Sequence, residues 1–118
     1  MTAVYHELEF LLSLDGSEFR FGAGYVVRIE AARVAATKNR PQGLKYSLTL
    51  HDAAGHRIYG LDNAHGIRRR EAEYDHRHIY GQRKIRPYVY RGSAELLEDF
   101  YNEVARILKE RGVSWITR

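Results

Sequence analysis

The chain contains no cysteine among its 118 residues. This absence excludes a disulfide framework, a thiolate zinc site and a cysteine nucleophile. No apolar run is long enough to cross a bilayer, and the first residues lack the basic start and unbroken apolar run of a signal peptide. Glycine-rich phosphate loops, nucleophile elbows and paired-carboxylate signatures are missing as well. We therefore expect a cytoplasmic protein with no membrane segment.

The composition that remains is ordinary for a globular protein, with 44% hydrophobic and 29% charged residues. A chain of this length is near the common domain size and is long enough to bury a core without covalent staples. We expect one domain over residues 1–118.

Apolar residues alternate with a period of two along much of the chain, which predicts an antiparallel sheet. Asp15-Gly16 is a strong turn signal and is expected to open a hairpin. Pro87 has no amide proton, so the last strand is expected at an edge or beside an interrupted ladder. Residues 31–36 fit a helical turn as an alternative. The predicted strands cover residues 4–14, 19–34 with a break at Gly22-Ala23-Gly24, 44–51, 56–61, 74–80 and 84–90.

The C-terminal segment has a helical pattern. Ser93 is a suitable N-cap residue and Gly112 a suitable stop. The predicted fold is therefore α+β: an antiparallel sheet of five to six strands covered by one C-terminal helix. The apolar residues of that helix fall on one face at helical spacing, and they are Leu97, Phe100, Tyr101, Val104, Ile107 and Leu108.

Titratable groups are concentrated in the second half of the chain, where five of the six histidines lie between His51 and His78. Two polar clusters, residues 62–66 and 74–78, flank the basic run Arg68–Arg70. From residue 65 to residue 91, eight Arg or Lys residues oppose three acids, a balance of +5; the whole chain carries +4, so the remainder sums to about −1. Such a local excess is the footprint expected where phosphates approach, although solvated surface is the other explanation.

The pair His76 and His78 is suited to acid–base chemistry. Residues two apart on a strand share a face, whereas Asp75 and Arg77 take the other face. Two imidazoles on one face can serve as general base and general acid near neutral pH. Together with an arginine that stabilises a phosphate oxyanion, they are the parts needed to cut RNA through its own 2′-hydroxyl without a metal or other cofactor.

Asp62, Asn63 and His65 lie at or just beyond the end of another predicted strand, where they would orient an imidazole or bind a phosphate oxygen. The candidate catalytic residues are His65, His76, His78, Asp62 and Asp75. The candidate substrate-binding residues are Ser47, Asn63, Arg68, Arg69, Arg70, Arg77, Lys84 and Arg86.

Other interpretations stay open. His76 and His78 with His65 or Asp62 would offer zinc or manganese mixed nitrogen and oxygen ligands, although the surrounding arginines argue against a metal. The histidines also fit a structural role, and the basic face fits a binding module without catalysis. Tyr88 and Tyr90 would either stack on unpaired bases or stiffen the sheet, whereas Tyr46 is assigned to the core.

Four sequence features resemble the TumE-type toxins of bacterial and archaeal toxin–antitoxin pairs. They are Lys45-Tyr46-Ser47, Asp62-Asn63-x-x-Gly66, Asp75-His76-Arg77-His78, and Leu97 with Asp99-Phe100. The resemblance covers roughly residues 44–100, and this chain departs from the pattern by extra residues at 67–74 that carry the triple arginine.

The resemblance implies growth inhibition by the toxin of a type II pair and a helix-turn-helix antitoxin as protein partner. An RNA target and ribonuclease activity come from the site chemistry and not from the resemblance. The C-terminal helix also leaves room for a homodimer.

Overall fold

The computed structural model describes residues 3–38, 40–63, 75–79 and 86–114, without the side chains of residues 3–5, 75–79 and 86. The elements run in the order α1 (Ala3–Ser13), β1 (Ser17–Arg20), the 3-10 turn η1 (Gly22–Gly24), β2 (Val26–Arg33), β3 (Leu44–His51), β4 (Arg57–Asp62), β5 (Asp75–Ile79), β6 (Arg86–Tyr88) and α2 (Ser93–Glu110).

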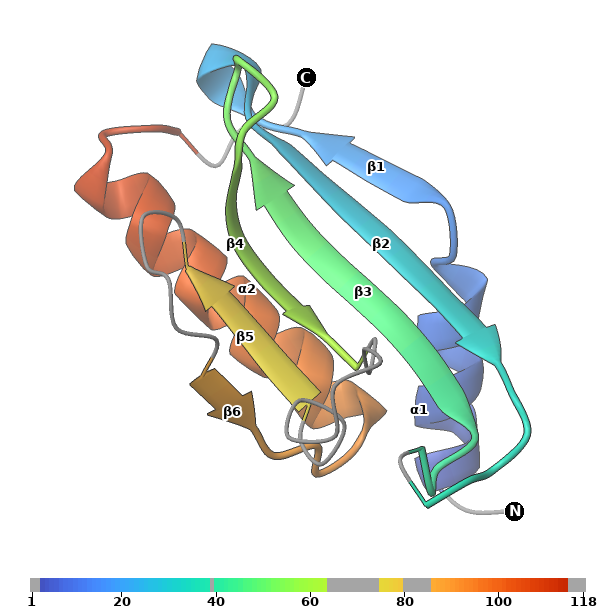
Figure 1. Ribbon diagram of the computed structural model, residues 1–118. Coiled ribbons are helices and arrows are strands. Elements are labelled where there is room, and N and C mark those ends of the chain that lie inside the picture. The colour runs from blue at the N-terminus through green and yellow to red at the C-terminus, as the bar shows by residue number, and fades with distance from the viewer. Residues whose placement is uncertain (1–2, 39, 64–74, 80–85, 115–118) are drawn as a thin grey trace.

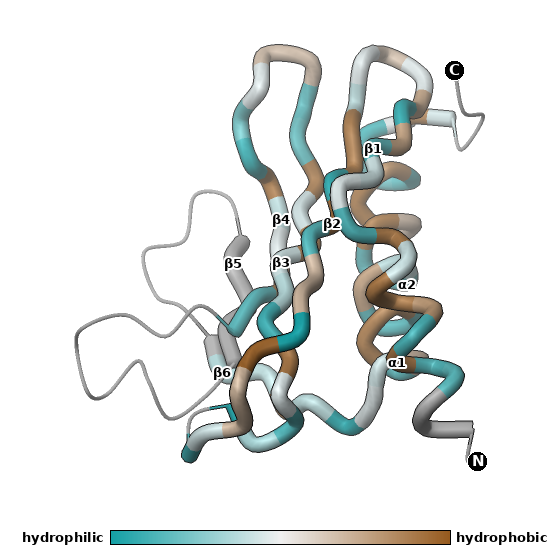
Figure 2. Tube along the Cα trace, turned by 90° about the vertical axis from the view of Figure 1, so that its right-hand side faces the viewer, coloured by the Kyte–Doolittle hydropathy of each residue, from teal (hydrophilic) through white to brown (hydrophobic). Residues whose placement is uncertain are grey.

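The strands form one antiparallel sheet whose spatial order, β1 to β6, is the chain order. Figures 1 and 2 show both helices on the same side of this sheet, so the described elements form two layers. The α+β class and the strand number are as predicted. The expected single covering helix is corrected to two, because α1 packs beside α2 and against β2.

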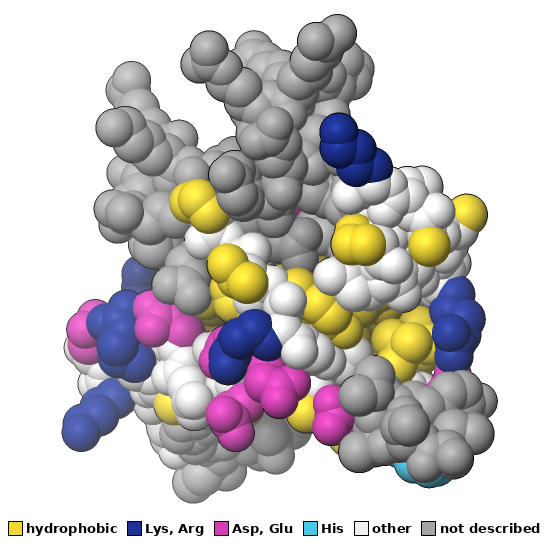
Figure 3. All heavy atoms as spheres, turned by 90° about the horizontal axis from the view of Figure 1, so that it is seen from below, with side chains coloured by type: hydrophobic (Ala, Val, Ile, Leu, Met, Phe, Trp, Pro, Cys, Tyr) yellow, Lys and Arg dark blue, Asp and Glu magenta, His cyan; other side chains and the backbone are white. Residues whose placement is uncertain are grey.

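The core lies between the sheet and the helices. Along β3, alternate residues are buried toward the helices, while Lys45, Ser47, Thr49 and His51 take the other face. Phe100 of α2 stacks on Tyr59 of β4 with ring centroids 5.8 Å apart. The end-on view in Figure 3 shows hydrophobic side chains across the middle of the molecule, with acidic and basic groups toward its edges. The fully buried residues include Leu11, Val27, Ile29, Leu48, Leu50, Leu61, Leu96, Phe100, Val104 and Leu108.

The segment predicted as a strand over residues 4–14 is helix α1, so that prediction is wrong. The segment carries apolar residues at both odd and even positions, so a period of two and a helical period both describe it. Leu8, Leu11 and Leu12 recur at helical spacing and pack against the core. Leucine and glutamate are common in this segment and are good helix formers, so helix propensity favours the helix where the apolar pattern does not decide.

Two predictions about chain reversals change with it. Asp15-Gly16 joins α1 to β1 and does not open a hairpin; Gly16 has the positive φ of 80° that suits glycine in such a turn. The first hairpin instead reverses at η1, within the stretch predicted as one strand over residues 19–34. Residues up to Arg33 belong to β2, so the helical alternative for this part does not hold.

For the C-terminal helix, the prediction that Gly112 ends the helix is confirmed, and the prediction that Ser93 is its N-cap is wrong. Gly112 follows α2 with a φ of 70°, and its backbone N–H donates to the carbonyl of Lys109 at 3.1 Å. The N-cap residue is Gly92, whose carbonyl accepts from the N–H of Leu96, while the Ser93 hydroxyl meets that of Tyr90 at 2.9 Å. As expected for a strand with Pro87, β6 is at an edge of the sheet.

Helix α1 yields a test by two neighbouring substitutions. A strand would bury Phe10 and expose Leu11, whereas the helix leaves Leu11 0% exposed and Phe10 59% exposed. We expect Leu11→Ala to lower the free energy of unfolding by about 2–5 kcal/mol, because it leaves a cavity under the sheet. Phe10→Ala should change it by less than about 1 kcal/mol. Urea denaturation of both variants measures this, and a larger loss for Phe10→Ala would contradict the helix.

Candidate functional site

The open face is the side of the sheet opposite the helices. In the described part of the chain no helix covers it, and it carries the half-exposed residues of β3 with the matching positions of the neighbouring strands. Its described polar side chains come from four strands: Glu18, Arg20, Arg28, Glu30, Lys45, Ser47, Thr49, His51, Arg57 and Asp62.

Strand register aligns one polar row directly across the open face. Glu30 of β2 pairs with Ser47 of β3, Ser47 pairs with Asp62 of β4, and Asp62 pairs with the backbone position of His76 in β5. We call Glu30, Ser47, Asp62 and position 76 the transverse row. Directly paired residues of antiparallel strands lie on the same face, so the row brings together groups far apart in the sequence.

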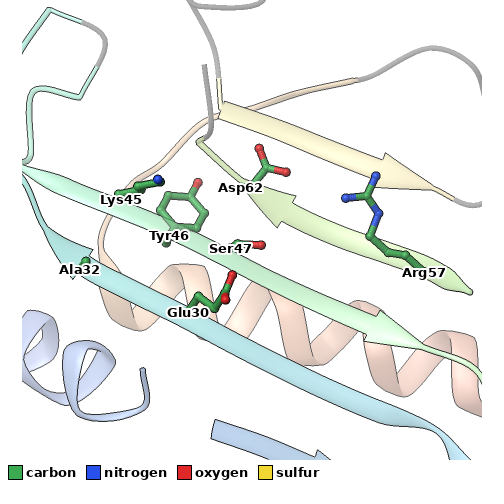
Figure 4. Close-up of a pocket in the computed structure, with 7 residues that line it drawn as sticks. All are labelled: Glu30, Ala32, Lys45, Tyr46, Ser47, Arg57 and Asp62. Carbon is green, nitrogen blue, oxygen red and sulfur yellow. The ribbon is translucent and has the colours of Figure 1, made fainter. Parts of the chain in front are cut away.

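A hollow of about 490 Å³ opens over this row. Figure 4 shows Glu30, Ser47 and Asp62 in line across three strands, with Lys45 toward one end and Arg57 toward the other. The Asp62 carboxylate is only 8% exposed, so it lies at the floor, whereas Glu30, Lys45 and Arg57 are exposed. The hollow therefore contains a row of two carboxylates and one hydroxyl, and a cation lies on each side of this row.

Most other described arginines form ion pairs with carboxylates, but the two cations of the hollow, Lys45 and Arg57, do not. On the same face, Arg28 Nε donates to the Glu18 carboxylate at 2.9 Å. Among the described side chains, by contrast, no carboxylate forms an ion pair with Lys45 or Arg57. Their charge is available to an anion from outside, such as a phosphate.

Gly60 leaves no room for a side chain where β4 pairs with β3. A Cβ at Gly60 would lie 3.2 Å from Cγ2 of Thr49 and 3.3 Å from the carbonyl oxygen of Leu48, closer than most side chains tolerate. It would also lie 3.7 Å from Cδ of Arg57, whose side chain passes over this position. Gly60 is paired with position 78 of β5, so a residue without a side chain faces that histidine position.

Asn63 holds the end of β4 against β3. Its side-chain carbonyl accepts from the backbone N–H of Tyr46 at 2.9 Å, and its amide nitrogen donates to the carbonyl of Leu44 at 2.6 Å. The backbone N–H of Asn63 also donates to the Tyr46 carbonyl at 3.3 Å. With the side chain 1% exposed, this clamp fixes the preceding Asp62 in the transverse row. The substrate contact predicted for Asn63 stays a prediction, whereas these contacts give it a positioning role.

The last strand, β6, is held to the helix layer by Asp99. The Tyr88 hydroxyl donates to Asp99 Oδ2 at 2.7 Å, and Arg91 donates to the same oxygen at 2.6 Å. Burial, aided by the Asp99 carboxylate, raises the pKa of the Tyr88 phenol, so it remains a neutral donor. Because β5 pairs with both β4 and β6, this contact helps to hold the histidine strand in the sheet.

The predicted histidine pair has a defined backbone position. Position 76 is opposite Asp62 and position 78 is opposite Gly60, so both belong to the open face. Position 75 is opposite Tyr88 and position 77 is opposite Leu61, which are buried residues of the helix-covered face. Between the two predicted orienting acids, the register therefore favours Asp62 over Asp75.

Several predicted site residues lie outside what the structure describes. For Asp75, His76, Arg77, His78 and Arg86 it describes the backbone in β5 and β6 and not the side chains. The residues outside the described ranges altogether are His65, Arg68, Arg69, Arg70 and Lys84. Their proposed roles stay predictions.

Three charged residues of the hollow were not predicted as site residues: Glu30, Lys45 and Arg57. The strand alternation that placed Ser47 on the cleft side also places Lys45 there, and that signal was available. Nothing local distinguishes Glu30 or Arg57, because their place beside Asp62 depends on how β2, β3 and β4 pair.

The tyrosines have mainly structural positions. Tyr46 is in the core, as predicted. Tyr88 is buried, so it does not present a free face for base stacking, and the half-buried Tyr90 ring lies 6.0 Å from that of Tyr46. In the ranges that the structure describes, no three His, Asp or Glu side chains form a group able to hold a metal ion. No described helix has the length and apolar character needed to cross a membrane.

A family model described as "Toxin TumE" matches residues 9–108 of this chain. The comparisons with curated proteins and with solved structures give no match. The matched range includes every described residue of the hollow and the whole of β5.

The Asn63 clamp predicts a large effect from an isosteric change. Asn63→Asp removes the donor to the Leu44 carbonyl and sets a carboxylate oxygen beside it. We expect a loss of at least about 2 kcal/mol in the free energy of unfolding at pH 7. The buried carboxyl would have a raised pKa in the folded state, so the cost should grow as pH rises above about 3.9 and vanish below it.

Denaturation at several pH values measures this effect. Asn102→Asp, the same change at an exposed position of α2, is the matched control and should alter stability by less than about 0.5 kcal/mol. Equal losses in the free energy of unfolding for the two variants would show that the Asn63 hydrogen bonds do not stabilise the fold.

Proposed function

Since this chain belongs to the TumE toxin family, we propose that it acts as a toxin on RNA, as a metal-independent ribonuclease of the open face. The family supports the toxin role and, in general, an antitoxin partner. We propose that this partner is a helix-turn-helix protein and that the toxin acts in the cytoplasm, where its RNA target is.

The observation that carries the proposal is the register between β4 and β5. It pairs Asp62 with position 76 and leaves glycine opposite position 78. A carboxylate beside an imidazole can set its tautomer and stabilise its protonated form.

In the proposed reaction one histidine of the pair His76 and His78 takes the proton from a ribose 2′-hydroxyl. The 2′-oxygen attacks the adjacent phosphorus and a 2′,3′-cyclic phosphate forms as the P–O5′ bond breaks. The other histidine gives a proton to the leaving 5′-oxygen, so protons and charge balance. Asp62 is the orienting group, because it is paired with position 76, whereas position 75 takes the helix-covered face.

Cations would stabilise the charge that builds on the phosphate. Lys45 and Arg57 border the hollow without an ion pair from any described side chain. We propose that they bind RNA phosphates together with Arg68, Arg69, Arg70 and Lys84, the other basic residues expected from the sequence, whereas the register sets positions 77 and 86 on the helix-covered face.

The histidine pair gives the most direct test. We expect His76→Ala and His78→Ala each to reduce kcat/KM for cleavage of a short RNA by about 10²–10⁴-fold and to abolish growth inhibition. His56→Ala, at an exposed turn, is the control and should retain both activities. Activity should persist in a chelator, and a 2′-deoxy substitution at the cleaved position should stop the reaction.

Each arm of this test has a result against the proposal. Full cleavage by both histidine variants would rule out their catalytic role. Loss of activity in the chelator would favour a metal-dependent nuclease, and cleavage of the 2′-deoxy substrate would exclude attack by the 2′-hydroxyl.

A non-catalytic binding module is the second candidate, favoured by the cations of the hollow that lack described ion-pair partners. Both candidates predict that Lys45→Ala and Arg57→Ala weaken RNA binding and lower the slope of log affinity against log salt by about 1 each. Lys109 is exposed on α2, away from the hollow, so Lys109→Ala is the control and should leave the slope unchanged. Fluorescence anisotropy at several salt concentrations measures this slope. An unchanged slope for both Lys45→Ala and Arg57→Ala would show that RNA does not bind at this surface.

A further inference from the structure

Glu30 is an unexpected group in a surface that is proposed to bind RNA. Its carboxylate is exposed and lines the hollow over the transverse row. Glu18, on the same face, holds Arg28 at 2.9 Å, but no described cation forms an ion pair with Glu30. An unpaired carboxylate repels phosphates, so in an RNA site it needs a different kind of ligand.

The ligand must bring hydrogen-bond donors, since an ionised carboxylate only accepts. RNA offers such donors from its ribose hydroxyls and from the edges of its bases. We propose that Glu30 reads a guanine base beside the phosphate that is cleaved, and this inference rests on the proposed function in RNA.

Base chemistry singles out guanine. Its Watson–Crick edge presents two neighbouring N–H groups, N1–H and N2–H, which match the two oxygens of a carboxylate. Adenine and cytosine present one amino group next to a ring acceptor, and uracil presents one N–H between two carbonyls. Each of these places an acceptor against a carboxylate oxygen, which costs a hydrogen bond and adds repulsion.

The positions around Glu30 suit a nucleotide. Neighbouring strands lie about 4.8 Å apart, so Glu30 and Asp62, two strands apart in one row, are separated by roughly 10 Å at the backbone. Ser47 lies between them with a hydroxyl that can meet the sugar (Figure 4). A guanine at Glu30 thus sends its ribose toward Ser47, and its phosphate lies within reach of the cations Lys45 and Arg57 of the hollow.

The test uses mononucleotides and the full chain, so that binding is measured apart from cleavage. In calorimetric titrations we expect guanosine 5′-monophosphate to bind at least about tenfold more tightly than adenosine 5′-monophosphate. Glu30→Gln, which replaces one acceptor by a donor, should bring this ratio close to one. Glu18→Gln, the same change at a neighbouring acid of the open face, should keep the ratio.

The outcomes separate this inference from the ribonuclease. Guanine preference that Glu30→Gln removes supports the base pocket even if the chain cleaves no RNA. Equal binding of the two nucleotides, or a preference unchanged in Glu30→Gln, overturns it even if RNA is cleaved. Circular dichroism of each variant confirms that the fold is intact, and Glu30→Ala repeats the measurement without any polar group at this position.

Discussion

The Asn63 side-chain amide joins the end of β4 to the backbone of β3, and the arrangement of the open face depends on it. Its two hydrogen bonds, 2.9 Å to the N–H of Tyr46 and 2.6 Å to the carbonyl of Leu44, continue the ladder beyond the last paired residue. A shift by one residue would turn Asp62 toward the core and break the transverse row. The Asp-Asn pair is thus one acid on the open face followed by the clamp that holds it there.

The helix layer explains why this face is the one with functional groups. Both helices lie on the opposite side of the sheet, so alternate residues of β3 and β4 are divided into core and open positions. Asp99 supports the division from the helix side, because it binds Tyr88 of β6 and Arg91. Asn63 and Asp99 are therefore positioning groups, in addition to the candidate catalytic residues of the open face.

Much of the fold was predictable where only one periodicity fits the sequence. The β3 and β4 strands and helix α2 follow from clear alternation or helical spacing. Helix α1 was missed because its apolar residues satisfy both periods, and its contact with α2 and β2 settles the choice. The sequence indicated the cleft side for Ser47 and Asp62, which strand pairing makes direct neighbours, whereas Glu30 and Arg57 have no local signal.

The order of residues alone was enough to mark a polar, basic segment with paired histidines and to assign their faces, because a strand alternates its side chains with a fixed period. Which acid faces the histidines was decided by tertiary structure. Strand pairing brings residues 30, 47, 62 and 76 into one line, although 14 to 17 positions separate each from the next in the chain. Register is a property of how strands meet, and no single strand carries that information in its own sequence.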